Sequence, residues 1–357
     1  MKILFTGGGT MGSVTPLIAV AEVLKARDPG CDLFWLGTRS GPEERVIRRY
    51  NIDFKGIFSG KLRRYFSMEN VLDVFKIIIG FWQAVFILIK LRPQAIVSAG
   101  GFVAVPVVWA SWFLGIPNII HQQDVKVGLA NNLCGLMAKK ITVCFPVTAK
   151  YFKKNKTEII GNPVRNNLRA MAALDKEALL ERLNLKKDWP VVLVTGGGTG
   201  ALALNQLVFD SLKELTKFCQ VVHLTGENKA DDDFSHENYI HYDFLVNIIP
   251  FIKIADLIVT RAGMGTLTEI SYLKKPALVM PIPRSHQVAN ADYFYERGAV
   301  EILDQEKIDS DDLIKRIKEL LDGKSKLKEL SKKIHEMIKW GAEERLAEII
   351  LETARKI

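Results

Sequence analysis

The sequence lacks the motifs that would assign it to a common class of nucleotide-dependent or metal-dependent protein. Its glycine-rich stretches contain neither a Walker lysine nor a GxGxxG motif followed by an acidic residue for a dinucleotide ribose. Its four cysteines show no CxxC spacing, and no histidine or acidic cluster has the spacing of metal ligands. We therefore expect free thiols in a reducing compartment, and neither a metal nor a cofactor.

Signals for nucleic-acid binding and for export are also missing. The sequence contains no compact basic helix and no aromatic motif that would stack on RNA bases, so we expect no nucleic-acid partner. Met1 leads directly into a predicted strand, so we expect no signal peptide.

The composition is that of a folded protein with an anionic partner. A length of 357 residues is enough for two domains with full cores, and 48% hydrophobic with 25% charged residues is ordinary for a soluble chain. The net charge is +9 and the pI is near 9.2. This balance indicates acidic lipid or a phosphorylated substrate as the partner.

The most informative stretch runs from residue 256 to residue 290. Asp256–Thr260 is a short β-branched run that is followed by Gly263 and Gly265. An apolar-periodic segment then ends at Lys274-Lys275-Pro276. The pattern predicts a strand, a glycine turn and a helix.

The start of this helix has two interpretations. Thr266 and Glu269 have the spacing of a capping box, in which case Glu269 only caps the helix. Alternatively, the two glycines keep side chains away from the N–H groups of the helix end, which then bind an anion.

A second polar set favours the ligand interpretation. The next predicted strand, Ala277–Pro281, is followed by His286, Gln287 and Asn290. Open α/β sheets bind ligands beyond the carboxyl ends of their strands, so both sets are expected at one site. Together these groups indicate a sugar-nucleotide pocket. The N–H groups would bind phosphate, the carboxylate would bind ribose hydroxyls, and the amides would bind a hexose.

The N-terminal half alternates strands with helices and predicts a doubly wound α/β sheet of about six strands. The first strand leads into a glycine loop, GGGTMGSVTP, and then a helix from about Pro16 to Arg27; a later strand leads into AGGFVAVP, and the next into HQQD. Polar side chains of HQQD thus lie where α/β enzymes place catalytic groups, although an Asp cap for the following helix is an alternative. The strands are predicted at Lys2–Thr6, Asp32–Gly37, Gln94–Ser98, Asn118–His121 and Ile141–Phe145.

The second half repeats this design. GNPVR, residues 161–165, is predicted as the crossing into a second domain, whose sheet opens at Pro190–Thr195 and continues into GGGTGALALNQ. Further strands are predicted at Val221–Thr225 and Tyr239–Tyr242, and residues 313–357 are predicted to be helical and mostly solvated. Two similar α/β domains facing each other across a cleft are therefore expected.

An apolar segment interrupts the first domain. The thirteen residues between Lys76 and Lys90 are polar only at Gln83. At ~1.5 Å per residue a helix of this length spans about 20 Å, short of the ~30 Å of a bilayer core, so we expect no transmembrane helix.

Two roles for this segment remain open: burial against the sheet, or an outer face that enters a membrane surface. The outer face is predicted to comprise Phe81, Trp82, Val85 and Phe86. The preceding basic loop, GKLRRYF, favours contact with anionic membrane lipids. Its cationic side chains are Lys61, Arg63 and Arg64.

Together these motifs resemble the MurG family over nearly the whole chain. In order they are the first glycine loop, GKLRRYF, GGFVAVP, HQQD with GLANN, GNPVR, GGGTGALALNQ, RAGMGTLTEI and HQVANA. The resemblance implies the two-domain GT-B fold. An acceptor and membrane-binding domain of residues 1–162 with a helix at 340–357 would be joined to a UDP-GlcNAc-binding domain of residues 163–339.

The resemblance also implies an activity and a location. The family transfers GlcNAc with inversion from UDP-GlcNAc to the C4 hydroxyl of MurNAc in lipid I (undecaprenyl-pyrophosphoryl-MurNAc-pentapeptide). The product is lipid II, a precursor of peptidoglycan. A peripheral position on the cytoplasmic face of the cell membrane follows.

Site residues are implied by the positions that match the family's motifs. Glu269 is expected on the ribose hydroxyls, the backbone of Leu245 at the uracil, and Arg165 with Gly198 beside the diphosphate. The sugar hydroxyls are assigned to Gln287 and Asn290, next to His286. The remaining donor-binding positions are Thr10, Met11, Gly12, Asp124, Met264, Gly265, Thr266, Leu267 and Thr268. The acceptor pyrophosphate is expected at Gly9, Ser13, Gly100 and Gly101.

Three departures from the family pattern concern the chemistry. Ser13 stands where the first loop usually ends in His, Gln122 replaces the glutamate of HEQN, and Gly198 replaces a common Ser. A neutral Gln and an isolated Ser accept protons poorly near neutral pH. Asp124 and His121 are then the candidates for the general base, and a route without a strong base stays open because the transition state resembles an oxocarbenium ion.

Two other functions fit the same motifs. One is a glycosyltransferase of this fold that uses another lipid acceptor, such as diacylglycerol. The other is a catalytically silent sugar-nucleotide binder, which Ser13 and Gln122 suggest. GKLRRYF and GGFVAVP favour the lipid I enzyme.

Overall fold

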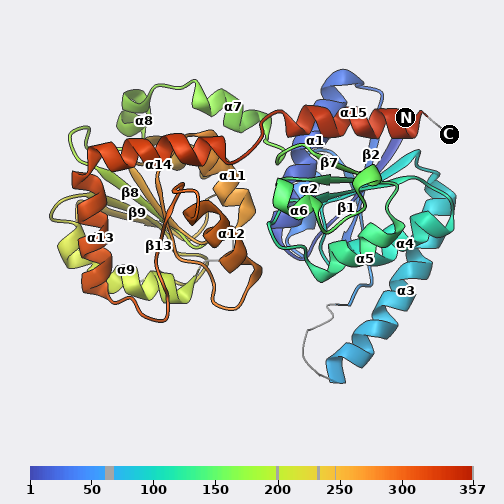
Figure 1. The fold of residues 1–357 in the computed structure, drawn as a ribbon, viewed down its shortest axis with the longest axis horizontal. Helices are drawn as coiled ribbons and strands as arrows, with labels where there is room; N and C mark the ends of the chain where they lie inside the picture. The colour runs from blue at the N-terminus through green and yellow to red at the C-terminus, as the bar shows by residue number, and fades with distance from the viewer. Residues whose placement is uncertain (61–67, 198–200, 231–233, 246, 356–357) are drawn as a thin grey trace. The chain divides into compact units, whose positions relative to one another are not determined.

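The computed structural model of the protein describes residues 1–60, 68–197, 201–230, 234–245 and 247–355 (Figure 1). The chain forms two compact units. Unit 1 comprises Met1–Asn166 and Lys339–Ile357, and unit 2 comprises Asn167–Ile338. The sequence prediction places the two crossings after residues 162 and 339.

Unit 1 contains a seven-stranded parallel sheet in the order β3-β2-β1-β4-β5-β6-β7. Every residue of β4 and β5 is buried, as expected for parallel strands covered on both faces. The strands are β1 (Lys2–Thr6), β2 (Asp32–Thr38), β3 (Asp53–Ile57), β4 (Ala95–Ser98), β5 (Asn118–Gln122), β6 (Lys140–Val143) and β7 (Thr157–Ile159).

Helices cover both faces of this sheet. Alternate residues of β1 point to opposite faces, and each set packs against different helices. Ile3 and Phe5 share a core cluster with α1 and α15, whereas Leu4 belongs to a cluster with α3 and α4. The helices are η1 (Met11–Ser13), α1 (Thr15–Arg27), α2 (Glu43–Arg49), α3 (Met68–Leu91), α4 (Ala104–Phe113), α5 (Leu129–Met137), α6 (Pro146–Ala149), η2 (Lys154–Lys156) and α15 (Ala342–Ala354).

Unit 2 contains a six-stranded parallel sheet in the order β10-β9-β8-β11-β12-β13. The strands are β8 (Val191–Thr195), β9 (Gln220–Leu224), β10 (Tyr239–Tyr242), β11 (Leu257–Thr260), β12 (Ala277–Val279) and β13 (Glu301–Ile302). The helices are α7 (Asn166–Ala172), α8 (Lys176–Arg182), α9 (Leu202–Leu215), α10 (Ile249–Ile254), α11 (Met264–Tyr272), α12 (His286–Tyr295), α13 (Ser310–Asp322) and α14 (Lys324–Glu336).

Each sheet has one switch point, where the chain reverses the direction in which strands are added. In unit 1 it lies between β1 and β4, and in unit 2 between β8 and β11. Ligands of open α/β sheets bind at the carboxyl ends of the strands at such points. All four glycine motifs of the sequence follow these four strands.

The chain returns to unit 1 through α15, which packs into the core rather than forming the solvated face predicted for residues 313–357. Gly161 has a φ of 90°, and a Cβ there would lie 1.8 Å from the carbonyl oxygen of Lys339. Glu343, buried at the start of α15, accepts a hydrogen bond from the N–H of Val164 at 3.0 Å. The GNPVR crossing and the returning chain are therefore bound to each other.

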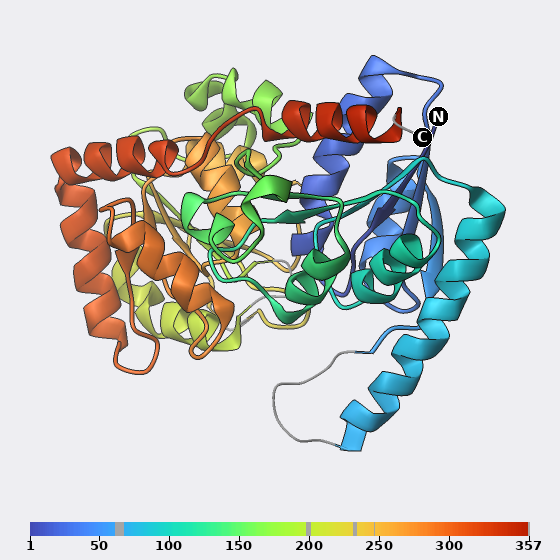
Figure 2. The same ribbon diagram turned by 45° about the vertical axis from the view of Figure 1, so that its right-hand side comes forward.

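The apolar segment forms a longer helix than the sequence predicts. Helix α3 has 24 residues, about 36 Å at ~1.5 Å per residue, and Leu72–Leu91 is long and apolar enough to cross a membrane. The predicted helix length of thirteen residues is therefore too short, and length alone does not exclude a membrane span. Ala84, Val85 and Leu88 are buried against unit 1, so Val85 is not part of an outer face. Figure 2 shows the N-terminal part of α3 extending beyond the sheet of this unit.

Candidate functional site

Two glycine loops meet at the switch point of unit 1. Gly9 has a φ of 80°, and Gly100 and Gly101 have φ values of 97° and 84°. A Cβ on Gly101 would lie 2.6 Å from the carbonyl oxygen of Gly8, so only glycine allows the two loops to approach this closely. Gly9, Gly100 and Gly101, all predicted near the acceptor pyrophosphate, are thus brought to one edge of the sheet.

The end of β5 joins these loops. Gln123 donates from Nε2 to the carbonyl oxygen of Gly12 at 2.8 Å. Ser13 is buried, and its hydroxyl donates within the loop to the carbonyl oxygens of Gly8 at 3.4 Å and Thr10 at 3.3 Å. Ser13 therefore closes the loop from inside. The other predicted residues of the loop are exposed or partly buried: Thr10, Met11 and Gly12.

The side chain of His121 has a structural position. It is fully buried, with Nδ1 3.0 Å from the hydroxyl of Thr142 and Nε2 3.0 Å from Oδ1 of Asn162. Burial lowers the pKa of His121 to about 4, against the opposing effect of the bond to Asn162. The ring is neutral at pH 7 and both nitrogens are occupied inside unit 1. The ring of His121 is therefore not available to act as the general base, contrary to the prediction.

Gln122 and Asp124 shape the turn after β5. Gln122 donates from Nε2 to the backbone oxygen of Asp124 at 2.9 Å and accepts from Nδ2 of Asn131 at 2.6 Å. Asp124 is partly buried, and its charge adds to the burial that raises the pKa of Cys144. The backbone of Asp124 is thus anchored, and its carboxylate lies at the carboxyl end of β5, next to Gln123, which contacts the first glycine loop.

In unit 2, helix α11 begins at the switch point without a cap from any side chain of the described residues. Gly263 is the N-cap and Met264 the first helical residue. Thr266 and Glu269 therefore lie inside the helix, and the predicted capping box is wrong. The first N–H groups of α11 are left for another acceptor.

The glycines before and within this helix start leave open space. No described atom lies within 4 Å of a Cβ built on Gly263 or Gly265. The φ of Gly263 is −74°, a value that any residue adopts. Neither packing nor backbone conformation requires glycine at 263. The absence of a side chain there leaves space beside the N-terminus of α11. Gly265, Thr266 and Glu269 are partly buried. Met264, Leu267 and Thr268 are buried, so a ligand can contact them only through their backbone.

Asn290 holds the turn that precedes α11. It is fully buried and donates from Nδ2 to the carbonyl oxygen of Ala262 at 3.1 Å. The structure therefore makes Asn290 a positioning residue for this turn, not an amide presented to a sugar as predicted.

The first turn of α12 is more accessible. Ser285 caps the helix and accepts from the N–H of Gln287 at 3.1 Å, while Oε1 of Gln287 accepts from the N–H of Ile282 at 3.2 Å. Gln287 is partly buried and His286 is exposed. Gln287 can donate to a ligand through Nε2.

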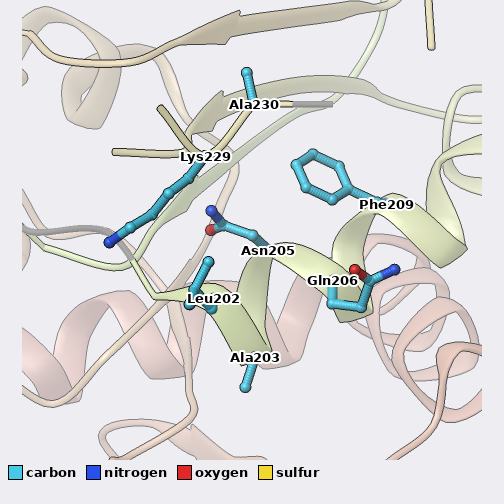
Figure 3. A pocket seen from close by; sticks show the side chains of 7 residues that line it. All are labelled: Leu202, Ala203, Asn205, Gln206, Phe209, Lys229 and Ala230. Atoms are coloured by element: carbon cyan, nitrogen blue, oxygen red, sulfur yellow. The ribbon is translucent and has the colours of Figure 1, made fainter. Parts of the chain in front are cut away.

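A groove of about 580 Å³ lies along the first turns of α9 (Figure 3). Asn205 is one of its lining residues and donates to the carbonyl oxygen of Thr225 at 2.7 Å. The lining residues do not include the predicted donor positions on α11 and α12. They are Leu202, Ala203, Asn205, Gln206, Phe209, Lys229 and Ala230. Because β8 and β11 are neighbours, α9 and α11 start at the same edge of the sheet.

The other predicted donor positions are spread along the chain. Arg165 is partly buried and belongs to unit 1, just before the crossing. Leu245 is partly buried between β10 and α10. Gly198 and the basic residues Lys61, Arg63 and Arg64 lie outside the described residues. Within the described ranges, no three His, Cys, Asp or Glu side chains gather as metal ligands would.

Sequence reasoning missed three buried residues that organise these loops. Asn131 fixes Gln122, and Glu43 accepts from the N–H of Gly9 at 3.2 Å. Arg261 donates from Nη1 to the carbonyl oxygen of Met280 at 2.9 Å, which ties the end of β11 to that of β12, and burial lowers its pKa. The local signal for each was a glycine two or three residues away, at Gly128, Gly41 and Gly263.

Both units match sequence profiles of one enzyme family. Residues 3–143 match the glycosyltransferase family 28 N-terminal domain, and residues 191–346 match the family 28 C-terminal domain. A protein of Lachnospira eligens is 38% identical over 325 residues, which is 89% of this chain and 90% of the relative. A protein of Legionella pneumophila is 35% identical over 99% of this chain and 97% of the relative. Both relatives are named UDP-N-acetylglucosamine--N-acetylmuramyl-(pentapeptide) pyrophosphoryl-undecaprenol N-acetylglucosamine transferase.

Solved structures agree with the fold. The crystal structure of MurG from Acinetobacter baumannii matches with a TM-score of 0.74 and 26% identity, over 98% of this chain and 99% of that one. The UDP-GlcNAc 2-epimerase of Neisseria meningitidis, solved with UDP-GlcNAc bound, has the same TM-score at 14% identity and covers 99% of this chain and 100% of its own. The second likeness concerns the fold alone. The predicted GT-B fold, with two parallel-sheet α/β domains, is confirmed.

Proposed function

Because the chain belongs to the UDP-N-acetylglucosamine--N-acetylmuramyl-(pentapeptide) pyrophosphoryl-undecaprenol N-acetylglucosamine transferases of glycosyltransferase family 28, we propose that it makes lipid II. It transfers GlcNAc from UDP-GlcNAc to the C4 hydroxyl of MurNAc in lipid I and releases UDP. One observation carries the proposal: relatives with this name at 35–38% identity cover nearly all of the chain, hence both units.

The donor binds at the switch point of unit 2. The uncapped N-terminus of α11 supplies N–H groups and a positive dipole end for the diphosphate, and the space beside Gly263 and Gly265 admits it. Glu269 accepts hydrogen bonds from the ribose hydroxyls, and the positive end of α11 offsets the charge that develops on the departing UDP. Stabilising the leaving group in this way lowers the barrier to breaking the glycosidic bond.

The acceptor binds at the glycine loops of unit 1. Gly9, Gly100 and Gly101 allow close approach to the pyrophosphate of lipid I, because no side chain stands between the ligand and the backbone. Asp124, beside these loops, takes the proton of the C4 hydroxyl as the new bond forms. Water takes it instead if proton loss follows bond formation.

Transfer of radiolabelled GlcNAc from UDP-GlcNAc tests the activity. We expect labelled lipid II when lipid I is supplied. Labelled product with diacylglycerol but not with lipid I would establish a different acceptor. UDP-GlcNAc binding without transfer to either would identify a silent sugar-nucleotide binder.

The variant Gln287→Ala tests recognition of the sugar. We expect its affinity for UDP-GlcNAc to fall by on the order of 1 kcal/mol, about fivefold, with UDP affinity unchanged, because one hydrogen bond to the hexose is lost. Calorimetric titration with both ligands measures this difference. The control, Asn290→Ala, should weaken both ligands alike, because Asn290 holds the turn at Ala262. An equal loss for both ligands in Gln287→Ala would contradict the assignment.

We further propose that the enzyme acts as a peripheral protein on the cytoplasmic face of the cell membrane. Six apolar side chains of α3, spaced alternately by three and four residues, form one exposed stripe: Leu72, Phe75, Ile79, Trp82, Phe86 and Ile89. Exposed Trp112 and Phe113 of α4 lie beside it, and Phe113 contacts Trp82 with ring centroids 6.5 Å apart. An exposed apolar surface of this extent supports insertion into a lipid surface, and the net charge of +9 supports anionic lipids.

The double variant Trp82→Ser with Phe86→Ser tests this surface. Phe81 is left in place because it is partly buried against α4. We expect binding to phosphatidylglycerol-containing vesicles to fall at least about tenfold, since each aromatic ring loses more than ~1 kcal/mol of apolar transfer. Turnover of a soluble short-chain acceptor should not change. Leu174→Ser, at another exposed apolar residue, is the control. Unaltered vesicle binding would refute this surface, and so would unfolding of the double variant.

A further inference from the structure

Glu43 is a buried carboxylate that connects β2 to the first glycine loop. Its side chain is 0% exposed although it is the first residue of α2. Oε1 accepts from the N–H of Thr38 at 2.7 Å and from its hydroxyl at 2.5 Å. Oε2 accepts from the N–H of Gly9 at 3.2 Å. The carboxylate thus joins the end of β2 to the turn after β1.

The surrounding backbone is shaped around this side chain. A Cβ on Gly8 would lie 2.1 Å from Oε1, and one on Gly41 would lie 2.0 Å from Oε2. A buried carboxylate is costly unless hydrogen bonds satisfy it, and three donors do so here. One of the three belongs to the glycine loop itself. The position of that loop is therefore coupled to the charge of Glu43.

Other contacts hold the loop at different points. Trp35 of β2 donates from Nε1 to the carbonyl oxygen of Gly7 at 2.9 Å. On its other side, Gly9 packs so closely that a Cβ would lie 2.5 Å from the ring of Phe102, in the second glycine loop. Gly9 thus lies between Glu43 and the GGF turn, with its left-handed φ of 80°.

We propose, on the basis of the function above, that Glu43 is a positioning residue for the acceptor. It fixes the turn at Gly9 so that the first glycine loop keeps the shape that receives the pyrophosphate of lipid I. Glu43 itself touches neither substrate. It acts through the backbone N–H of Gly9.

The variant Glu43→Gln separates this role from packing. It keeps the shape of the side chain but replaces one accepting oxygen with an NH₂ donor. The single remaining oxygen stays with Thr38, which offers two donors at shorter distances than the one from Gly9. The N–H of Gly9 then faces another donor, and the turn loses its restraint.

We expect Glu43→Gln to raise the KM for a short-chain lipid I analogue about tenfold while the KM for UDP-GlcNAc stays the same. Hydrogen exchange of the peptide covering residues 7–13 should become faster. The matched control is Glu44→Gln, because the neighbouring carboxylate is 41% exposed and pairs with Arg48 on its own helix. Glu44→Gln should change neither quantity.

Equal acceptor KM values in folded Glu43→Gln and Glu44→Gln would overturn the proposal. If Glu43→Gln does not fold, Glu43→Asp takes its place, because the side chain is one methylene shorter and its carboxylate cannot reach both Thr38 and the N–H of Gly9. Glu43→Asp with wild-type exchange at residues 7–13 and a wild-type acceptor KM would also overturn it. Failure of the proposed function looks different: the wild-type protein would not transfer GlcNAc to lipid I, although the loop would still respond to Glu43→Gln.

Discussion

Glu269→Ala is expected to weaken the binding of UDP-GlcNAc by about 2–3 kcal/mol, roughly 30-fold to 150-fold, because hydrogen bonds to a charged acceptor are lost. The structure supports this expectation because it excludes the alternative role of Glu269 as a cap of α11. Helix α11 begins at Met264 after Gly263, so Glu269 lies beyond the first turn and does not cap the helix. Glu269 is a partly buried carboxylate on the helix that starts at the switch point, where open α/β sheets bind their ligands.

Calorimetric titration with UDP and with UDP-GlcNAc measures this effect. Because ribose is common to both ligands, both affinities should fall together, in contrast to Gln287→Ala. Circular dichroism must show an intact fold. Glu296→Ala, at an exposed glutamate after the end of α12, is the control and should bind both ligands normally. Normal donor affinity in Glu269→Ala would leave this carboxylate with a structural role only.

Asp124→Asn is expected to lower kcat by ~10²-fold or more with the donor KM little changed, if Asp124 takes the proton of the acceptor hydroxyl. Burial removes His121 from consideration, since both its ring nitrogens are bonded inside unit 1 and its pKa is about 4. Gln122 is committed to the backbone oxygen of Asp124 and to Asn131. Asp124 is then the carboxylate of the HQQD turn beside the glycine loops.

The substitution is nearly isosteric, so a loss of kcat reports on the charge rather than on packing. Asp32→Asn serves as the control, because Asp32 is exposed at the amino end of β2, the opposite edge of the same sheet. Initial rates with saturating UDP-GlcNAc and a soluble acceptor give both constants. Near-normal turnover of Asp124→Asn would favour the mechanism in which water accepts the proton.

The strands could be predicted well because they are buried parallel strands that end in glycine turns. The predicted strand Lys2–Thr6 coincides with β1, and Tyr239–Tyr242 coincides with β10. The missed strands lie at sheet edges and are short or half-exposed. They are β3, with its polar Lys55, the three-residue β7 and the two-residue β13.

The errors at the site have a common physical cause, which is contact between residues far apart in the sequence. His121 is bonded to Thr142 and Asn162, and Asn290 to Ala262. A motif shows that a polar side chain follows a strand, but not whether a distant segment covers it. The capping box failed for a different reason: a four-residue pattern cannot show where the preceding turn ends. The extra length of α3 arises from Met68–Lys76, where charged residues hide the continuation of the helix.

The return of the chain through α15 determines the order in which the domains can be completed during synthesis. The core cluster of unit 1 includes Leu346, Ile349 and Ile350 from α15, packed with Ile3 and Phe5 of β1. All of unit 2, residues 167–338, leaves the ribosome before α15 exists. Domains usually fold in the order of their synthesis, N-terminal first. Here the core on one face of β1, to which α1 also contributes, stays incomplete until α15 emerges, so the domain whose translation begins first is the last to finish folding.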